Sequence, residues 1–270
     1  MATDVLHHQP LMPHLLIEGL NRFHDEPCLF LGDKVASYRE VRETTSQMVQ
    51  ALQSKGLGVG SRIAVISANR PEVLSNIAAM QLNGCIGTPL HPMGSLDDHA
   101  YILEAAEIDT LIFDASAFSD LARALEQRVP GLKNLLGFGP SKVGDDYLAL
   151  AAGFPPKPLL APDVSPDDVA SVNFTGGTTG KPKGVMSTYS VTSYMTQIQL
   201  AEWEFPDELR MLIATPLSHA AAAFLIPVLQ KGGAFYVMQR FNPVAFFDMV
   251  EQHRITCTML VPVMLYSLLD

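Results

Sequence analysis

The sequence predicts a doubly wound α/β protein, with mostly parallel sheets that carry helices on both faces. Short runs of aliphatic and β-branched residues alternate with longer amphipathic stretches along the chain, and this alternation is typical of strand–helix–strand units with parallel strands. With 270 residues, 48% of them hydrophobic, the chain can bury a substantial core. The same hydrophobic content excludes a disordered protein, which would have too few apolar residues to form a core.

The individual elements follow from the hydrophobic period and from the positions of proline and glycine. Strands are predicted at residues 62–67, 85–90, 110–113, 171–174, 211–215, 234–238 and 256–261. Helices are predicted at residues 38–55, 71–83, 95–106, 115–128, 191–201, 220–230, 243–253 and 264–269. Pro71 and Pro243 each begin a predicted helix, where the first turn tolerates proline. Gly56 follows Lys55 as a typical residue after a helix C-terminus.

A proline-rich stretch predicts the connection between two sub-domains. Residues 153–168 include Pro155, Pro156, Pro158, Pro162 and Pro166, and such a density of proline interrupts regular structure. The predicted first sub-domain therefore covers residues 1–160, and the second covers residues 161–270. The sequence shows no internal repeat and no low-complexity tract.

Composition narrows the classes of partner and compartment. The net charge of −10 disfavours nucleic acid as a partner. Cys28, Cys85 and Cys257 form no metal-binding pattern and are expected to be reduced thiols. The N-terminus lacks the features of a signal peptide, and the longest apolar run, residues 220–229, is too short to span a bilayer. We therefore expect a cytoplasmic protein with no transmembrane segment and no metal ligands; peripheral membrane contact and the oligomeric state are left open.

Residues 174–185, Phe-Thr-Gly-Gly-Thr-Thr-Gly-Lys-Pro-Lys-Gly-Val, are the segment that is most informative about function. Three threonines, three glycines and two lysines occur here within nine residues. Glycines let backbone N–H groups approach an anion closely, threonine hydroxyls donate hydrogen bonds, and lysine adds charge-assisted contacts to phosphate oxygens. A solvated turn is the plain alternative, but this density directly after an apolar run favours a polyphosphate-binding loop.

The loop does not match the two commonest nucleotide-binding signatures. The Walker pattern needs four residues between its first glycine and Gly-Lys, followed by serine or threonine. Here three residues separate Gly176 from Gly180, and Pro182 follows Lys181. The dinucleotide pattern also fails, because Gly176 and Gly177 are adjacent. A kinase or P-loop ATPase is therefore disfavoured.

The loop resembles the signature of the adenylate-forming enzymes, which include acyl-CoA and aryl-CoA ligases, luciferases and non-ribosomal adenylation domains. Their usual form is Thr/Ser-Ser-Gly-Thr-Thr-Gly-x-Pro-Lys-Gly, and this chain departs from it at Gly176, where serine is more common. The change removes one hydroxyl but keeps a small residue. Weaker similarities occur in the family's order at residues 37–40, 62–65, 81–92, 215–219 and 261–264, so that the resemblance covers nearly the whole chain.

The resemblance implies an ATP-dependent reaction in two steps. A carboxylate attacks the α-phosphorus of ATP, which gives an acyl-adenylate and pyrophosphate; a thiol, usually that of coenzyme A, then displaces AMP. Mg²⁺ accompanies ATP. Positioning and charge neutralisation carry such chemistry, and no catalytic residue is identified in this stretch. The family's phosphate-contacting positions match Thr175, Gly176, Gly177, Thr178, Thr179, Gly180 and Lys183.

The resemblance also implies a pocket for the acyl group and its carboxylate. His219 matches the histidine of the family's Pro-x-x-His element, which borders the carboxylate, although periodicity alone would make it an ordinary helix-start or core residue. The expected pocket residues are His219, Ala220 and Ala221, whose small alanine side chains leave room for a bulky or long acyl group; a packed helix would use alanines as well. Arg240 lies near the position where some relatives bind coenzyme A phosphates, but an exposed arginine at a strand end fits equally well.

Members of this family are about twice as long, and their segments for adenine, ribose and the catalytic lysine have no match here. We therefore expect the N-terminal part of a fatty-acid–CoA ligase, without the C-terminal domain and inactive or impaired alone. Its expected partners are a small-molecule carboxylic acid, ATP and coenzyme A. Alternatives within the class are an aryl or phenylpropanoid CoA ligase and a free-standing adenylation domain. A non-catalytic nucleotide-binding module is the alternative from another class.

Overall fold

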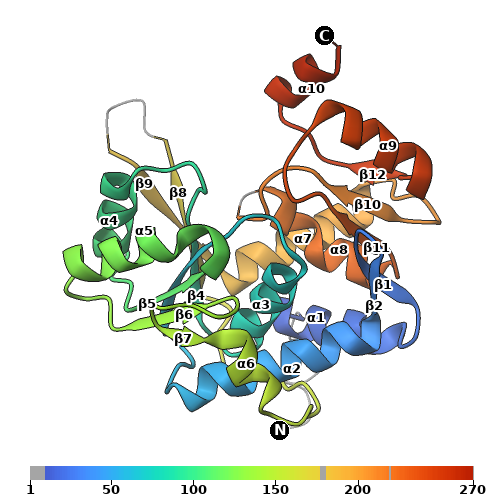
Figure 1. Cartoon of the computed structure of the whole chain (residues 1–270). Coiled ribbons are helices and arrows are strands. Elements are labelled where there is room, and N and C mark those ends of the chain that lie inside the picture. Colours follow the sequence, from blue (N-terminus) through green and yellow to red (C-terminus); the bar gives the residue numbers. More distant parts are fainter. Residues whose placement is uncertain (1–9, 177–180, 219, 270) are drawn as a thin grey trace, which may run out of the picture.

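The computed structural model describes residues 10–176, 181–218 and 220–269, and it contains two β-sheets separated and flanked by helices (Figure 1). The strands are β1 (Pro27–Leu31), β2 (Lys34–Ser37), β3 (Arg62–Ile66), β4 (Ile86–Pro89), β5 (Thr110–Phe113), β6 (Asn134–Gly137), β7 (Asp145–Asp146), β8 (Val169–Thr175), β9 (Lys183–Thr188), β10 (Arg210–Ile213), β11 (Ala234–Val237) and β12 (Cys257–Thr258). The helices are α1 (Met12–Arg22), α2 (Tyr38–Ser54), α3 (Pro71–Leu82), α4 (Leu96–Ala105), α5 (Ala115–Arg128), α6 (Tyr147–Ala152), α7 (Tyr189–Glu202), the 3₁₀ helix η1 (Ala220–Phe224), α8 (Leu225–Gln230), α9 (Pro243–His253) and α10 (Pro262–Leu269).

The larger sheet has seven strands in the order β7-β6-β5-β3-β4-β8-β9. Its strands run parallel from β7 to β8, and the edge strand β9 is antiparallel to β8. All four residues of β5 are buried, as expected for a parallel strand with both faces covered. The carboxyl ends of β3, β4, β5 and β8 therefore lie along one edge of this sheet.

The smaller sheet has five strands in the order β12-β10-β11-β1-β2. The strands β12, β10, β11 and β1 run parallel, whereas β2 returns antiparallel to β1. Leu29 of β1 pairs with Phe235 of β11, although the two residues are far apart in the sequence. This pairing ties the first strand of the chain to its last third.

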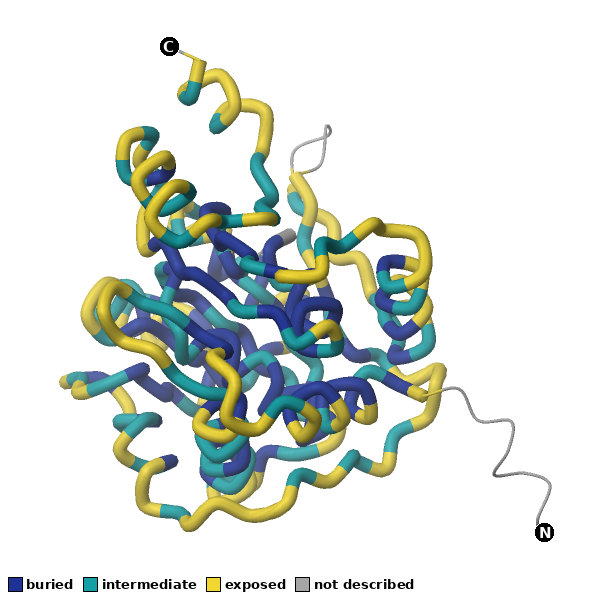
Figure 2. Tube along the Cα trace, turned by 90° about the vertical axis from the view of Figure 1, so that its right-hand side faces the viewer, coloured by how far each residue is buried: buried dark blue, intermediate teal, exposed yellow. Residues whose placement is uncertain are grey.

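Helices α1, α2, α3 and α8 fill the space between the two sheets. The largest apolar cluster joins side chains of these helices to Ile63 of β3 on one side and to Met211 and Phe235 of the smaller sheet on the other. Side chains on the opposite faces of the strands pack against α4 and α5 on the larger sheet and against α9 on the smaller one. Figure 2 shows that the buried residues concentrate in this interior, whereas α10 is exposed. The arrangement confirms the predicted fold class, with helices on both faces of mostly parallel sheets.

Most predicted elements are confirmed to within a few residues, but the helix predicted at 220–230 is wrong in form. The segment begins as the 3₁₀ helix η1, and α8 starts only at Leu225. Pro227 explains the division, because proline in a helix interior clashes with the carbonyl of the residue four positions earlier and donates no hydrogen bond. Starting α8 at Leu225 places Pro227 in the first turn, where no donor is needed.

The prediction at 256–261 is also too long. Only Cys257 and Thr258 are in a strand, and they pair with β10 alone at the edge of the smaller sheet. Seven elements of the structure were not predicted from the sequence: α1, β1, β2, β6, β7, α6 and β9.

Each sheet takes strands from both sides of residue 160, where the sequence analysis places its sub-domain boundary. Strands β8 and β9 follow this point but belong to the larger sheet, while β1 and β2 precede it and belong to the smaller sheet. Residues 153–168 contain neither helix nor strand and connect α6, which ends at Ala152, to β8.

Candidate functional site

The carboxyl ends of the two sheets meet at Asn69, which follows β3 and is buried. Its side-chain amide donates to the carbonyl oxygens of Thr215 (2.9 Å) and Met238 (3.1 Å), and its Oδ1 accepts from the backbone N–H of Leu217 (2.8 Å). Thr215 follows β10 and Met238 follows β11. The buried amide of Asn69 therefore links the segments that follow β3, β10 and β11 by hydrogen bonds. Ligands of open α/β sheets bind beyond such strand ends, and this junction is therefore the candidate site.

Arg70 fixes the neighbouring strand end of the larger sheet. Its guanidinium donates to both carboxylate oxygens of Glu72 (2.9 and 3.2 Å), to Asp114 Oδ1 (3.1 Å) and to the carbonyl of Phe138 (3.0 Å). Burial alone would lower the pKa of Arg70, but the hydrogen bond and charge of Glu72 and the charge of Asp114 outweigh it and raise the pKa. Arg70 therefore stays charged and orders the segment after β3.

The predicted phosphate loop connects β8 to β9 at the tip of an antiparallel hairpin. Thr175 and Lys183 pair directly across the hairpin, and both are exposed. Gly176 is exposed, and a Cβ built on it would meet no atom within 4 Å. Its backbone is therefore accessible to an anion. Gly177, Thr178, Thr179 and Gly180 lie outside the described residues.

Lys181 and Lys183 occupy different surroundings, which separates the two lysines of the loop. The ammonium of Lys181 lies 5.2 Å from the ring centre of Tyr101 on α4, within the range of a cation–π interaction. Lys183 lies in β9 opposite Thr175. The lower rank expected for Lys181 as a phosphate ligand stays a prediction.

A cavity of about 300 Å³ lies between the sheets, next to the junction at Asn69. One wall comes from Val73, Ile77 and Met80 of α3, and another from Ser171 and Asn173 of β8. The lining also includes residues that follow β3 and β10, and residues of η1, α7 and β4. An apolar cavity with a few polar side chains is typical of a small-molecule site.

The segment of the predicted Pro-x-x-His element borders this cavity. Leu217 and Ser218 line it, as do Ala222 and Ala223 of η1. Ala221 is buried in the core that packs on α1 to α3 and does not line the cavity. Ala220 begins η1, and nothing is described of its side chain. His219 lies outside the described residues.

Arg240 lies just beyond the carboxyl end of β11, on the side of the junction that belongs to the smaller sheet. It is exposed, and among the described residues it forms no ion pair. Its position at a strand end agrees with both interpretations given above, so its assignment to coenzyme A stays a prediction.

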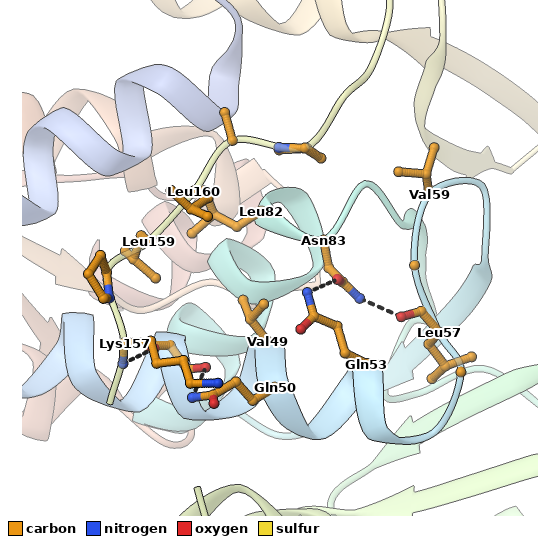
Figure 3. Close-up of a pocket in the computed structure, with 16 residues that line it drawn as sticks. Val49, Gln50, Gln53, Leu57, Val59, Leu82, Asn83, Lys157, Leu159 and Leu160 are labelled. Atoms are coloured by element: carbon orange, nitrogen blue, oxygen red, sulfur yellow. Dashed lines mark hydrogen bonds between the residues drawn. The ribbon is translucent and has the colours of Figure 1, made fainter. Parts of the chain in front are cut away.

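A second, larger cavity of about 570 Å³ lies away from the strand ends, among α2, the end of α3 and the proline-rich connection (Figure 3). Gln53 donates to Asn83 Oδ1 (3.1 Å), and Asn83 donates to the carbonyl of Leu57 (2.8 Å). Through these two hydrogen bonds, the side chain of Asn83 at the end of α3 contacts both α2 and the turn that follows α2. None of the predicted site residues lines this cavity, and we assign it no role in the reaction.

The described residues contain no cluster of three or more acidic, histidine or cysteine side chains that could hold a metal ion. Burial raises the pKa of the Cys28 thiol to about 12. The pKa of Cys85 also rises to about 12, chiefly through burial. Both thiols are therefore protonated and unreactive at neutral pH. No helix among the described residues is long and apolar enough to cross a membrane.

The roles of Asn69, Arg70 and the α3 wall were not predicted from the sequence. A usable signal was present, because the segment Asn69-Arg70-Pro71 directly follows a predicted parallel strand, where ligands of doubly wound proteins bind. The partners of Asn69 were not visible in this way, since Thr215 and Met238 are distant in the sequence.

The chain combines a glycine-rich hairpin with an apolar cavity at the junction of two mostly parallel sheets. The chain belongs to the family of AMP-binding enzymes, which matches residues 17–270. It is 47% identical over 263 residues to the medium/long-chain-fatty-acid–CoA ligase FadD8 of Mycobacterium tuberculosis, covering 95% of this chain and 46% of that protein.

Two solved structures resemble the fold closely. The amide bond synthetase McbA of Marinactinospora thermotolerans superposes with a TM-score of 0.85 at 25% identity, over 97% of this chain and 51% of that one. The o-succinylbenzoate coenzyme A synthetase MenE of Bacillus subtilis, solved in complex with ATP and magnesium ion, gives a TM-score of 0.80 at 22% identity, over 97% and 67% of the two chains. The chain spans about half the length of the curated relatives it matches.

Proposed function

We propose that this chain supplies the phosphate-binding hairpin and the acyl pocket of an AMP-forming acid–thiol ligase that acts on fatty acids. The complete reaction joins a carboxylic acid to coenzyme A through an acyl-adenylate. The observation that carries this proposal is a shared cavity: β8, which leads into the phosphate loop, and Leu217 and Ser218, which lead into His219, line the same 300 Å³ space. An acid bound there has its carboxylate between the two segments that the chemistry requires.

The hairpin residues fit a nucleoside triphosphate. Thr175 can donate its hydroxyl, Gly176 offers an open backbone, and the Lys183 ammonium neutralises negative charge on the phosphates. Mg²⁺ bound with ATP would supply further neutralisation. Since the described residues offer no cluster of metal ligands, we assign no metal ligand to this part of the chain.

The first step forms a bond between a carboxylate oxygen and the α-phosphorus and breaks the bond from that phosphorus to pyrophosphate. In the second step a thiolate attacks the acyl carbon, and AMP leaves. No protein nucleophile is required, so the residues of this chain act by holding the acid and the phosphates in line and by excluding water. The apolar wall of α3 favours an alkyl chain, in agreement with the similarity to a fatty-acid–CoA ligase.

The phosphate assignment is tested by ATP binding, measured by titration calorimetry. Lys183→Ala and Thr175→Ala are each expected to weaken binding about tenfold, because each removes one contact to a charged group. Lys157→Ala is the matched control, since this exposed lysine lies at the larger cavity. Unchanged ATP affinity in both loop variants would overturn the assignment.

The reaction is tested by carboxylate-dependent exchange between ATP and pyrophosphate, with short, long and aromatic acids. We expect exchange by this chain alone to be weak or absent, and saturated fatty acids to give the strongest response where exchange is seen. A response confined to aromatic acids would contradict the fatty-acid assignment. ATP binding without any exchange, even in the presence of additional polypeptide from a relative, would support a non-catalytic nucleotide-binding module.

A further inference from the structure

The α3 wall of the cavity contains one side chain that can change its shape easily. Val73, Ile77 and Met80 lie on one face of α3 at helical spacing and all line the cavity. Valine and isoleucine are branched at Cβ, so their first torsion angle is nearly fixed in a helix. Met80 is unbranched and has three rotatable bonds beyond Cα, which lets it fill or vacate space at low cost.

Met80 is held in its position by a weak contact. The Asn76 side-chain amide, one turn earlier and fully buried, donates to Met80 Sδ at 3.3 Å. A thioether sulfur is a poor acceptor, so this contact selects one conformer of Met80 without locking it. Met80 is only 4% exposed. It belongs to the apolar core and lines the cavity.

Gly87 of β4 faces the end of the Met80 side chain and lines the same cavity. A Cβ built on Gly87 would lie 3.2 Å from Met80 Cε. The absence of a side chain at Gly87 therefore leaves the room that the Met80 methyl group occupies. The backbone of Gly87 is ordinary extended strand, paired with Ile63 and Ser171, so the need for glycine here comes from space and not from conformation.

We propose that Met80, seated against Gly87, determines the length of the alkyl chain that the cavity accepts. This inference rests on the proposed function, since it assigns the cavity to the acyl group. The ligand class is a fatty acid, because the α3 wall that Met80 belongs to is apolar. The residue sets specificity through the depth of the cavity and takes no part in the chemical steps.

The test is titration calorimetry of this chain with octanoate, dodecanoate and hexadecanoate, each below its micelle concentration. Met80→Ala removes three heavy atoms from the wall and is expected to improve dodecanoate binding relative to octanoate by about tenfold, roughly the effect of burying two further methylene groups. Gly87→Ala adds a methyl group at the same contact and is expected to shift the ratio about fourfold in the opposite direction. Met93→Ala is the control, because Met93 is 85% exposed.

The outcomes separate this inference from the proposed function. Opposite shifts in the two variants, with no shift in Met93→Ala, support the assignment of Met80. If the unaltered chain binds fatty acids but neither variant changes the ratio, the role of Met80 is overturned and the proposed function stands. If the unaltered chain binds ATP but no fatty acid, the cavity is not the acyl site and both fail. Gly87→Ala keeps the test decisive should Met80→Ala unfold, because it adds atoms without opening a hole in the core.

Discussion

Arg70 joins three separate segments through a single guanidinium, and we expect it to be one of the most sensitive residues for stability. The side chain of its partner Asp114 is only 6% exposed, and the guanidinium also lies over the Phe138 ring, 5.5 Å from its centre. Arg70→Ala leaves a buried carboxylate without its counter-ion, which costs about 3 kcal/mol of unfolding free energy. Arg70→Lys should recover only part of this, because lysine has a single nitrogen and lacks the planar fork with which Arg70 contacts both carboxylate oxygens of Glu72.

Urea denaturation measures both variants, with Arg39→Ala as the matched control. Arg39 pairs with Asp25, but the two side chains are 50% and 79% exposed, so its loss should cost less than about 1 kcal/mol. Equal losses for Arg70→Ala and Arg39→Ala would contradict the structural role of the buried pair.

His99 gives the stability of the chain a dependence on pH. It is 1% exposed on α4, and its pKa is lowered, chiefly because burial disfavours the charged ring. The unfolded chain therefore binds a proton more readily than the folded chain. The contribution of His99 to the unfolding free energy is fully present above pH 6.5, its ordinary pKa, and is lost as the pH falls below that value. One such proton contributes a slope of at most about 1.4 kcal/mol per pH unit.

The comparison of the unaltered chain with His99→Gln isolates this effect. The difference in unfolding free energy between the two should be constant above pH 6.5 and should shrink as the solution becomes more acidic. Parallel stability curves throughout the acidic range would show that His99 is not the responsible group.

Predictability at the scale of residues depends on how far apart interacting residues lie in the sequence. Thr175 and Lys183 could be linked from sequence because they flank one glycine-rich turn, and the structure pairs them directly. Asn69 could not be linked to Thr215 or Met238, because no local pattern records a hydrogen bond between distant strand ends.

At the scale of elements, helix α2 begins with reciprocal hydrogen bonds that the sequence also encodes. The Ser37 hydroxyl accepts from the Glu40 backbone N–H, and the Glu40 carboxylate accepts from the Ser37 backbone N–H at 2.7 Å. Ser37→Ala removes the cap and should lower the unfolding free energy by about 1 kcal/mol. Glu40→Gln should cost less, because glutamine also serves at the third position of such a capping box.

Thermal unfolding followed by circular dichroism tests this ranking. The order expected is unaltered chain, Glu40→Gln, then Ser37→Ala, in decreasing melting temperature. A larger effect of Glu40→Gln would show that the charge at the helix N-terminus outweighs the hydroxyl cap.

The boundaries of elements could be predicted where a capping residue or proline marks a helix start. The prediction was wrong where a proline lies inside an apolar run. Ser37 and Pro71 mark helix starts that the structure confirms. Pro227 lies within a run with uniform helical hydrophobicity, so periodicity predicted one helix, whereas steric exclusion divided it into η1 and α8. The short edge strands β7 and β12 pair over two residues each, and such short segments carry no period at all.

At the scale of the whole molecule, the alternation of strands and helices predicted the class of fold but not the composition of the sheets. Hydrophobic periodicity predicts that a segment is a strand, but it does not predict which strands pair with it. The pairing of β1 with β11, and of β4 with β8, brings together segments from opposite sides of the proline-rich connection. The junction that forms the candidate site exists because of these non-local pairings, so its geometry required the structure.

Helix α7 presents an apolar face to solvent, which leads to a prediction about association. Val191, Tyr194, Met195 and Ile198 recur at the spacing of one helix face and are each more than half exposed, at 51%, 56%, 56% and 52%. Val185 and Met186 of the adjoining β9 are exposed as well. Several large apolar side chains exposed on one helix face favour association.

We therefore expect the isolated chain to self-associate as its concentration rises, measured by sedimentation velocity, and to bind a hydrophobic dye in the folded state. Met195→Glu combined with Ile198→Glu places two charges on the α7 face and should shift the chain toward the monomer, because burying unpaired carboxylates in an interface is costly. Met93→Glu adds a charge at an isolated exposed position and should leave association unchanged. If the unaltered chain stays monomeric at high concentration and binds no dye, the apolar face of α7 does not drive self-association, and this prediction is wrong.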